Sequence, residues 1–356
     1  MSTRDVNVQK GRKPDFMNHV FSIMERFAPE ALEIMVIRYQ ILRQVLHHQP
    51  VGRRQLGNTL GYTERTIRSE VDYLKMRGAI HTTSAGICLT PYGEEMLSEI
   101  DEFIPFLYNT QTLAERVKQK FNLKEVIVVP GDSYLDNTVK KDLGMTAARH
   151  VNKLLFAGCT LAVTGGTTLA EMAAAMCQGN NTADILVVPA RGGLGEEMEQ
   201  QAGAIAARIA KAIGAQYRLL HIPDNLEEGT AEILKNDVHI QRVLSSIKSS
   251  NILVHGIGPA MEMANRRGLF APELFLLEQK QAVGEALRYY FDKKGNIVYE
   301  VPGIGLEMKD LDHIETVVAV AGGKRKAEAI KAVLGHGRLD VLITDEGAAR
   351  EIIRLI

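Results

Sequence analysis

The feature that most constrains the fold is an alternation of short apolar runs with helical segments, which begins at Lys124. Seven runs have the length and the content of branched apolar residues that buried strands require: 126–129, 161–164, 185–188, 219–222, 252–254, 317–320 and 341–344. Strands that alternate with helices form a parallel sheet with right-handed crossovers. We therefore expect a doubly wound α/β domain over residues 124–356.

One pair of apolar runs departs from this alternation. Ala286–Phe291 and Asn296–Val301 flank a turn that contains Lys293-Lys294-Gly295, so we expect an antiparallel hairpin. The chain has 356 residues, which leaves room for a second domain with a core of its own before Lys124.

The first 90 residues have the pattern of a winged helix-turn-helix domain. Apolar residues recur at helical spacing over Ala31–His48, and shorter helices are expected over Arg53–Leu60 and Glu64–Met76, the last capped by Thr63. Residues 79–89 read as two short strands around a Ser-Ala-Gly turn. Residues 1–28 are expected to form a mobile arm and a short helix, and residues 91–123 a helical linker interrupted at a proline.

The second helix of this motif carries the side chains that such domains place in the major groove. We expect Arg65, Thr66, Arg68 and Ser69 to face base edges there. Arg53 and Arg54 begin the preceding helix, where they can hold DNA phosphates. Residues 1–90 contain 13 Lys and Arg against 8 Asp and Glu, whereas the remainder contains 29 against 35. The alternative is a helical protein-interaction module with solvated arginines.

A glycine-rich turn follows the second strand of the α/β domain. Gly165, Gly166, Thr167 and Thr168 lie between the run that ends at 164 and a helix expected over 169–176. Glycines let the backbone approach an anion, and a helix N-terminus offers unpaired amides. The two hydroxyls add further donors, so the turn is a phosphate-binding candidate, although such turns also occur without a ligand.

Other strand ends carry similar residues. Arg191 follows the third strand in a Gly-rich segment that continues to Gly195, the fifth is followed by His255-Gly256-Ile257-Gly258, and Lys324-Arg325-Lys326 begins a helix after the sixth. Because ligands of open parallel sheets bind outside the carboxyl ends of the strands, we expect Arg191 and Lys326 to converge with the GGTT turn. Two cationic strand ends are better suited to a ligand with two phosphates than to a ligand with one phosphate.

These motifs together resemble a known family. The segments VTGGTT, VPARGGLGE, LVHGIG, AGGKRKAEAI and ITDEGAA look like the effector domain of the SorC family of sugar-responsive regulators, over residues 124–356 and more loosely over the helix-turn-helix. The family's effector domain is similar in fold to sugar-phosphate isomerases and deaminases. The resemblance implies a DNA-binding repressor of a glycolytic operon that is relieved by fructose 1,6-bisphosphate.

The resemblance also implies which residues bind the effector. One phosphate would lie between the GGTT turn and a lysine, the other near arginines, and the sugar hydroxyls near an amide and a carboxylate. The residues implied are Gly165, Gly166, Thr167, Thr168, Arg191, Gln201, Arg266, Arg267, Glu285 and Lys326. The KRK run is more basic than the family pattern, which leaves Lys324 open as the alternative to Lys326.

The composition indicates the cellular compartment and limits the cofactors and metals that we expect. Three cysteines without a CxxC or Cys/His cluster give no disulfide framework or zinc site, which fits a reducing cytoplasm. The first residues lack the apolar segment of a signal peptide, and no apolar stretch approaches a membrane span. We expect no cofactor and no metal. The expected partners are an operator in double-stranded DNA, a sugar-phosphate effector and a second copy of the chain, as a homodimer or homotetramer.

Two other functions remain possible at this stage. The enzymes of similar fold use carboxylates as general bases, and Asp224, Glu285 and Asp345 follow or lie near strands, with His221 and His255 also nearby. A helix-turn-helix has no purpose in an isomerase or deaminase, so we expect no enzyme activity. In the third reading, the α/β domain only oligomerises the DNA-binding domain.

Overall fold

The computed structural model describes residues 4–178, 184–193, 197–224, 226 and 228–356. The chain divides into two compact units, Met1–Thr110 and Gln111–Ile356. No helix in the described part of the chain is both long and apolar enough to cross a membrane.

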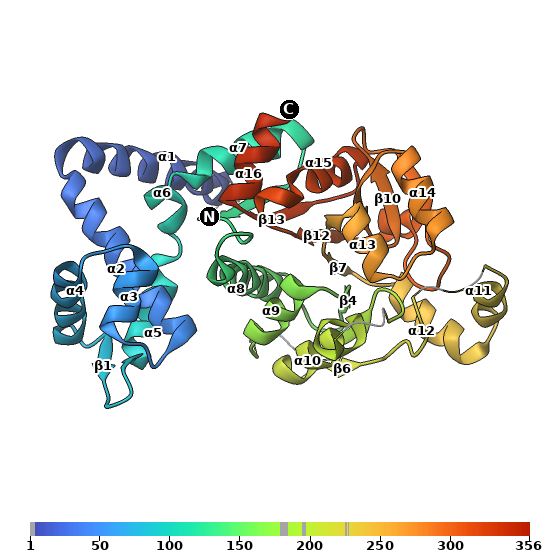
Figure 1. Cartoon of the computed structure of the whole chain (residues 1–356), viewed down its shortest axis with the longest axis horizontal. Helices are drawn as coiled ribbons and strands as arrows, with labels where there is room; N and C mark the ends of the chain where they lie inside the picture. Colours follow the sequence, from blue (N-terminus) through green and yellow to red (C-terminus); the bar gives the residue numbers. More distant parts are fainter. Residues whose placement is uncertain (1–3, 179–183, 194–196, 225, 227) are drawn as a thin grey trace. The chain divides into compact units, whose positions relative to one another are not determined.

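The smaller unit contains six helices and a two-stranded sheet among its described residues (Figure 1). They are α1 (Arg4–Phe27), α2 (Pro29–His48), α3 (Arg53–Leu60), α4 (Glu64–Met76), β1 (Ile80–Thr82), β2 (Ile87–Leu89), α5 (Pro91–Ile100) and α6 (Ile104–Leu107). The predicted bounds of α3 and α4 and the antiparallel wing β1–β2 are confirmed. The Thr63 side chain caps α4, where it accepts from the Thr66 amide at 3.2 Å.

A mobile arm and a short helix were expected over residues 1–28, whereas the structure has one long helix, α1, over 24 residues from Arg4 to Phe27. A tertiary contact that the local sequence does not reveal supports its second half. Phe21 is buried, and its ring stacks on Phe106 of α6 with 5.6 Å between ring centroids. Packing against another element stabilises helices more than local propensity does.

Helix α4 is fixed on the smaller unit from both sides. Its apolar residues Ile67, Val71 and Leu74 are buried in the core that α2 and α3 complete. On its outer side, the guanidinium of Arg38 from α2 lies 3.6 Å from the ring centroid of Tyr73 and donates to Glu70 Oε2 at 2.7 Å. The first turn of α4 is therefore presented from a rigid support.

The larger unit is built on seven parallel strands in the order β3-β13-β12-β7-β4-β5-β6. The strands are β3 (Glu125–Val129), β4 (Thr160–Val163), β5 (Leu186–Pro189), β6 (Gln216–Tyr217), β7 (Ile252–His255), β12 (Thr316–Val320) and β13 (Val341–Asp345). The predicted parallel sheet is thus confirmed. The predicted strand over 219–222 is wrong, because β6 ends at Tyr217 and the Ile222 carbonyl accepts from the Gly193 amide in a loop at 2.9 Å.

Helices cover both faces of this sheet, as Figure 1 shows. Helices α8 (Asn137–Leu154), α9 (Thr167–Ala175) and α10 (Ala202–Ile213) pack on one face. Helices α7 (Thr110–Phe121), α12 (Val238–Lys248), α15 (Ala327–His336) and α16 (Glu346–Arg354) pack on the other. Alternate residues of one strand enter opposite cores, as Val317 and Val318 of β12 do, which is the arrangement expected of a buried parallel strand.

A second, antiparallel sheet has the order β11-β10-β9-β8. Its strands are β8 (Gly258–Pro259), β9 (Ala282–Ala286), β10 (Tyr289–Asp292) and β11 (Ile297–Glu300), and α13 (Ala260–Arg266) and α14 (Ala271–Gln279) pack on it. The hairpin β10–β11 was predicted, but its first arm was not one strand from Ala286 to Phe291. Leu287 and Arg288 both have positive φ and make a tight turn there, so Glu285 lies on a separate strand, opposite Tyr290.

The order of the strands places a topological switch point between β4 and β7. From β4 the chain continues outward to β5 and β6, whereas from β7 it continues in the opposite direction to β12 and β13. Loops that leave two neighbouring strands on opposite sides open a crevice at the carboxyl ends of those strands, which is where open α/β sheets bind ligands.

Candidate functional site

The GGTT turn leaves β4 at this switch point and begins α9. Gly166 has φ +126°, a conformation that side chains disfavour, and a Cβ at Gly165 would lie 2.5 Å from the Gln200 carbonyl oxygen. The Gly166 amide donates to that same oxygen at 2.8 Å. Glycine is therefore required at both positions, and the turn is fastened to the 3₁₀ turn η1 (Met198–Gln200).

Among the described residues, no side chain caps the amides at the start of helix α9. The first N–H groups of a helix have no partner within it and carry the positive end of the helix dipole. Thr167 and Thr168 occupy this first turn, half-buried and buried respectively. Thr164 joins the two sides of the switch point, because its Oγ1 accepts from the Gly256 amide after β7 at 3.1 Å.

An open pocket lies in front of this turn. Its walls come from the carboxyl ends of β4, β5, β7 and β12, from α13 and from β9. The lining residues are Thr164, Gly165, Gly166, Thr167, Thr168, Leu169, Arg191, Gly256, Ile257, Gly258, Glu262, Met263, Arg266, Glu285, Leu287, Val320 and Lys326.

The structure separates the three cations of the KRK run. Lys324 is exposed and its Nζ lies 3.9 Å from Glu351 Oε2. The Arg325 guanidinium lies over the ring of Tyr134 at 4.2 Å from its centroid. Lys326 lines the pocket, and its burial lowers the pKa of its ammonium group. Of the two lysines left open by the sequence, Lys326 is the one at the pocket.

Two arginines approach the pocket from different elements. Arg191 follows β5, and its Nη1 donates to Asp224 Oδ2 at 2.8 Å. Arg266 ends α13, and its Nη2 donates to Gln200 Oε1 at 3.1 Å. The glycine-rich segment after Arg191 continues through Leu194 and Gly195, which lie outside the described residues.

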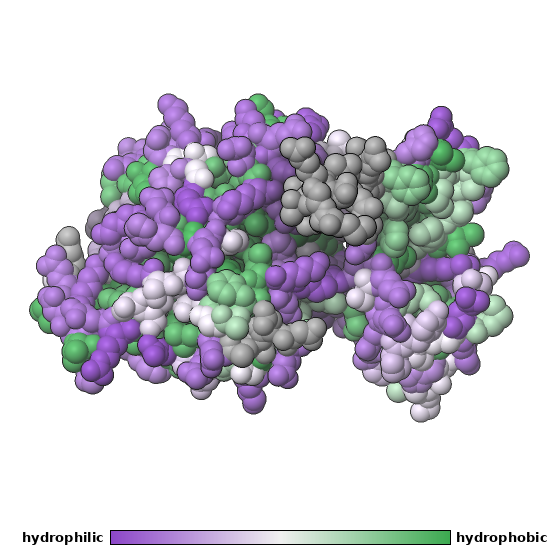
Figure 2. All heavy atoms as spheres, turned by 180° about the vertical axis from the view of Figure 1, so that it is seen from behind, coloured by the Kyte–Doolittle hydropathy of each residue, from purple (hydrophilic) through white to green (hydrophobic). Residues whose placement is uncertain are grey.

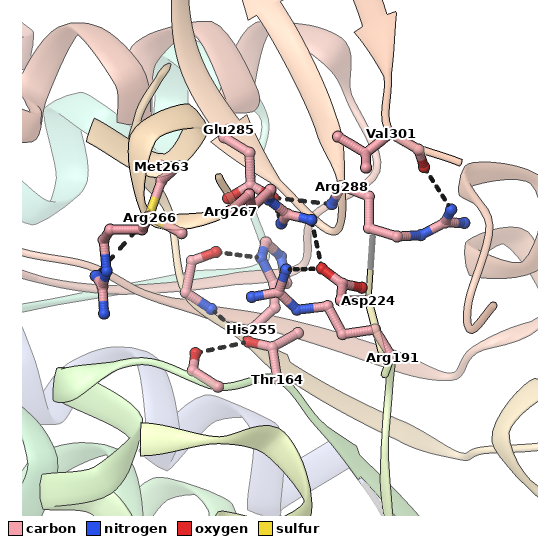
Figure 3. A network of polar contacts seen from close by, with 12 residues as sticks. Thr164, Arg191, Asp224, His255, Met263, Arg266, Arg267, Glu285, Arg288 and Val301 are labelled. Carbon is pink, nitrogen blue, oxygen red and sulfur yellow. Dashed lines mark hydrogen bonds and ion pairs between the residues drawn. The ribbon is translucent and has the colours of Figure 1, made fainter. Parts of the chain in front are cut away.

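Two of the expected contact residues do not line the pocket. Arg267 lies behind it with no exposed side-chain surface, held by Asp224 and Glu285 (Figure 3). The amide of Gln201 lies beside Gly193, since a Cβ there would be 3.2 Å from Gln201 Oε1. The other eight expected residues are all among the lining residues.

Of the wall that α13 supplies, only Arg266 was predicted from the sequence. Glu262 and Met263 line the pocket one turn before Arg266. The signal was present, because α13 starts directly after the Gly-Ile-Gly segment that follows β7, and helices that leave a strand's carboxyl end border the crevice.

The carboxylates and histidines considered for catalysis have other partners. Asp345 caps α16 and accepts from the Ser133 and Gly323 amides at 2.8 and 2.6 Å. Burial lowers the pKa of His255, whose Nδ1 lies 3.1 Å from the Gly256 carbonyl oxygen. His221 is exposed and does not line the pocket. Across the described residues, no group of three or more His, Cys, Asp or Glu is placed to hold a metal ion.

The smaller unit presents the expected DNA-reading side chains. Arg65, Arg68 and Ser69 are exposed on the first turns of α4, and Thr66 is half-buried. Arg68 Nη2 lies 3.2 Å from Glu64 Oε1 in an exposed pair, which costs little to open. Arg53 and Arg54 are exposed at the start of α3, where an exposed Gly52 precedes them and no side chain caps the helix.

Two family models match this chain. Residues 34–104 match the model of the CggR N-terminal DNA-binding domain, and residues 107–354 match a model described as a sugar-binding domain. The chain is 41% identical to the central glycolytic genes regulator of Priestia megaterium and 38% identical to that of Bacillus subtilis. Both alignments cover 95% of this chain and 99% of the relative.

Solved structures of transcription regulators also have a similar fold. A SorC family transcriptional regulator from Enterococcus faecalis is 42% identical, with a TM-score of 0.64, over 68% of this chain and 99% of that one. The full-length sorbitol operon regulator SorC from Klebsiella pneumoniae is 19% identical, with a TM-score of 0.65, over 89% of this chain and 98% of that one. The second similarity shows the fold alone.

Proposed function

Because this chain belongs to the SorC family of sugar-binding transcription regulators, we propose that it represses a glycolytic operon until fructose 1,6-bisphosphate binds its larger unit. The observation that carries the proposal is the pocket at the switch point, where an uncapped helix start meets Arg191, Arg266 and Lys326. We infer the glycolytic operon from the names of the two relatives, which are both central glycolytic genes regulators. We place the protein in the cytoplasm, where bacterial DNA and glycolytic metabolites meet.

The pocket's chemistry fits a bisphosphorylated sugar. The first turn of α9, with its two hydroxyls and Lys326, supplies donors for one phosphate. Arg191 and Arg266 supply the cations for the second, and Glu285 supplies an acceptor for a sugar hydroxyl. Gln201 and Arg267 are not proposed to contact the effector, because neither lines the pocket.

The repressor is proposed to act as a homodimer or homotetramer. Helices α1 and α2 carry the exposed apolar side chains Phe16, Ile23, Phe27 and Ile34, and Figure 2 shows apolar surface gathered on the smaller unit. Such patches are typical of protein contacts. An effector that changes how two copies pair would prevent their α4 helices from meeting successive major grooves.

The test is a titration of a preformed complex between the protein and its operator. Fructose 1,6-bisphosphate should release the DNA, and in the absence of DNA it should raise the melting temperature of the larger unit, because a ligand stabilises the state that binds it. Fructose 6-phosphate, glucose 6-phosphate and inorganic phosphate serve as comparison ligands. Release by a monophosphate at the same concentration would contradict the assignment of a bisphosphate.

The recognition helix can be tested separately. Arg65→Ala and Arg68→Ala should each weaken operator binding by about 1–3 kcal/mol, the value of a bidentate contact to guanine. Both side chains are exposed on α4, so neither change should unfold the smaller unit. Fluorescence anisotropy with a labelled operator and a scrambled duplex measures the effect.

Arg53→Ala is the matched control for that experiment. It should weaken binding to both duplexes equally and reduce the salt dependence, because a phosphate contact is independent of sequence. If the Arg65/Arg68 double variant binds the operator as tightly as the wild type, α4 is not the reading helix.

We also expect the protein to lack enzyme activity. The relatives are named as regulators, and the buried carboxylate at the pocket, Glu285, is held through Oε1 by Arg267 and by the Arg288 amide. Purified protein should produce no isomer, ammonia or cleavage product from sugar phosphates above the background rate. Turnover that disappears in Glu285→Gln would overturn this expectation.

A further inference from the structure

Two oppositely charged residues of the pocket come from different sheets. Arg191 follows β5 of the parallel sheet, and Glu285 lies on β9 of the antiparallel sheet. Both line the pocket, and both are almost completely buried. In Figure 3, Asp224 and Arg267 join Arg191 to Glu285. Neither residue of this central pair lines the pocket.

The four residues form one continuous chain of ion pairs. Asp224 Oδ2 accepts from Arg191 Nη1 at 2.8 Å and also from Arg267 Nη1. Arg267 Nη2 donates to Glu285 Oε1, which also accepts from the Arg288 amide at 2.8 Å. The charges alternate along the chain, which is why so many can be buried together.

The central pair, Asp224 and Arg267, holds Arg191 and Glu285 in place. The side chains of Asp224 and Arg267 have no exposed surface. Burial opposes the charge of Arg267, but Glu285 and Asp224 outweigh it and raise the pKa of Arg267. A guanidinium is a planar fork that fixes two carboxylates at once, which an ammonium group does not do. The rotamers of both outer residues therefore depend on this pair.

Arg191 and Glu285, at the two ends of this chain of ion pairs, each keep hydrogen-bonding groups that the ion pairs do not use. Among the described residues, Arg191 donates through Nη1 alone and Glu285 accepts through Oε1 alone. The remaining N–H groups of Arg191 and Oε2 of Glu285 are not among the buried atoms without a partner. Because both residues line the pocket, we expect these groups to face it, one as a set of donors for an anion and the other as an acceptor for a hydroxyl.

We propose that Asp224 and Arg267 are the positioning residues of the effector site. They set Arg191 for a phosphate and Glu285 for a sugar hydroxyl without touching the effector. The inference rests on the proposed function, since it assumes that a sugar phosphate occupies this pocket. It also gives Arg267 an indirect role in place of the direct contact that the sequence implied.

The experiment measures effector and operator binding in the full-length protein. Asp224→Asn removes the negative charge, and Arg267→Lys replaces the planar guanidinium by an ammonium group. Both changes alter the side-chain volume little. Each should weaken the binding of fructose 1,6-bisphosphate, measured by calorimetry, by about 10- to 100-fold, as outer-shell partners of metal ligands do. Operator affinity without effector should stay within about twofold, because the smaller unit is unchanged.

Asp340→Asn is the matched control. Asp340 is equally a buried carboxylate paired with an arginine, Arg338 Nη1 at 2.7 Å. It precedes β13, at the opposite end of the sheet from the pocket. This variant should lose stability in urea without changing effector affinity. An equal loss of effector affinity in the control would mean that general destabilisation explains the result and would overturn the proposal.

A double-mutant cycle separates positioning from structural support. If Arg267 acts partly through Glu285, Arg267→Lys should weaken effector binding less in a Glu285→Gln background than in the wild type. Additive losses would overturn the proposal, as would variants that bind like the wild type. If the wild type itself binds none of fructose 1,6-bisphosphate, fructose 6-phosphate and inorganic phosphate, the proposed function fails first and the inference falls with it.

Discussion

The Thr167→Ala/Thr168→Ala double variant is expected to remain on its operator at effector concentrations that release the wild-type protein. Both hydroxyls lie on the first turn of α9 at the pocket. A hydrogen bond to a charged group contributes about 1.5–3 kcal/mol. Loss of both should therefore raise the effector concentration needed for release by about 10²- to 10⁴-fold. Titration of the preformed operator complex measures the shift.

Thr138→Ala provides the comparison for this variant. Thr138 is also a buried threonine on the first turn of a helix, α8, but it does not line the pocket. It should respond to effector as the wild type does, and all variants should bind operator equally without effector. A double variant that responds at the wild-type concentration would show that the phosphate lies elsewhere.

Arg267→Met should have the largest effect on stability. The change removes the cation between Asp224 and Glu285 and leaves both carboxylates buried. Breaking a buried ion pair from one side costs about 3–5 kcal/mol, a large part of the stability of an ordinary domain. Urea denaturation followed by circular dichroism should show the transition of the larger unit at a clearly lower midpoint.

A second substitution identifies the cause of that loss. Glu285→Gln added to Arg267→Met should recover part of the stability, because it removes the buried carboxylate that loses its arginine partner, whereas Asp224 keeps Arg191. Arg338→Met, which breaks an ion pair with a partly exposed arginine, should cost less. Equal stability of Arg267→Met and the wild type would show that the ionic chain contributes little to folding.

Local signals made the DNA-reading helices predictable. Gly61 has a positive φ and ends α3, and Thr63 caps α4 with its own side chain, so both boundaries are set within a few residues of chain. The GGTT turn was predictable for a similar reason, because its conformation depends on its own glycines. The extent of α1 was not, since it depends on a contact with Phe106, far away in the sequence.

Other parts of the site depended on tertiary neighbours. Arg266 and Arg267 are adjacent in the sequence, but consecutive residues at a helix end point about 100° apart, so one faces the pocket and the other the interior. The apolar run at 219–222 satisfies a strand pattern, yet it buries Leu220 and hydrogen-bonds to a loop. Sequence periodicity reports burial and does not distinguish these backbone partners.

The wall that α13 supplies has a consequence for engineering. Glu262, Met263 and Arg266 belong to one short helix, while the donors at the GGTT turn are mainly backbone groups of another segment. Libraries confined to Glu262 and Met263 would vary this wall of the pocket and leave both the GGTT turn and Arg266, a proposed phosphate contact, unchanged. Under the proposed function, such libraries would give genetically encoded biosensors that report other phosphorylated metabolites through an unchanged DNA readout.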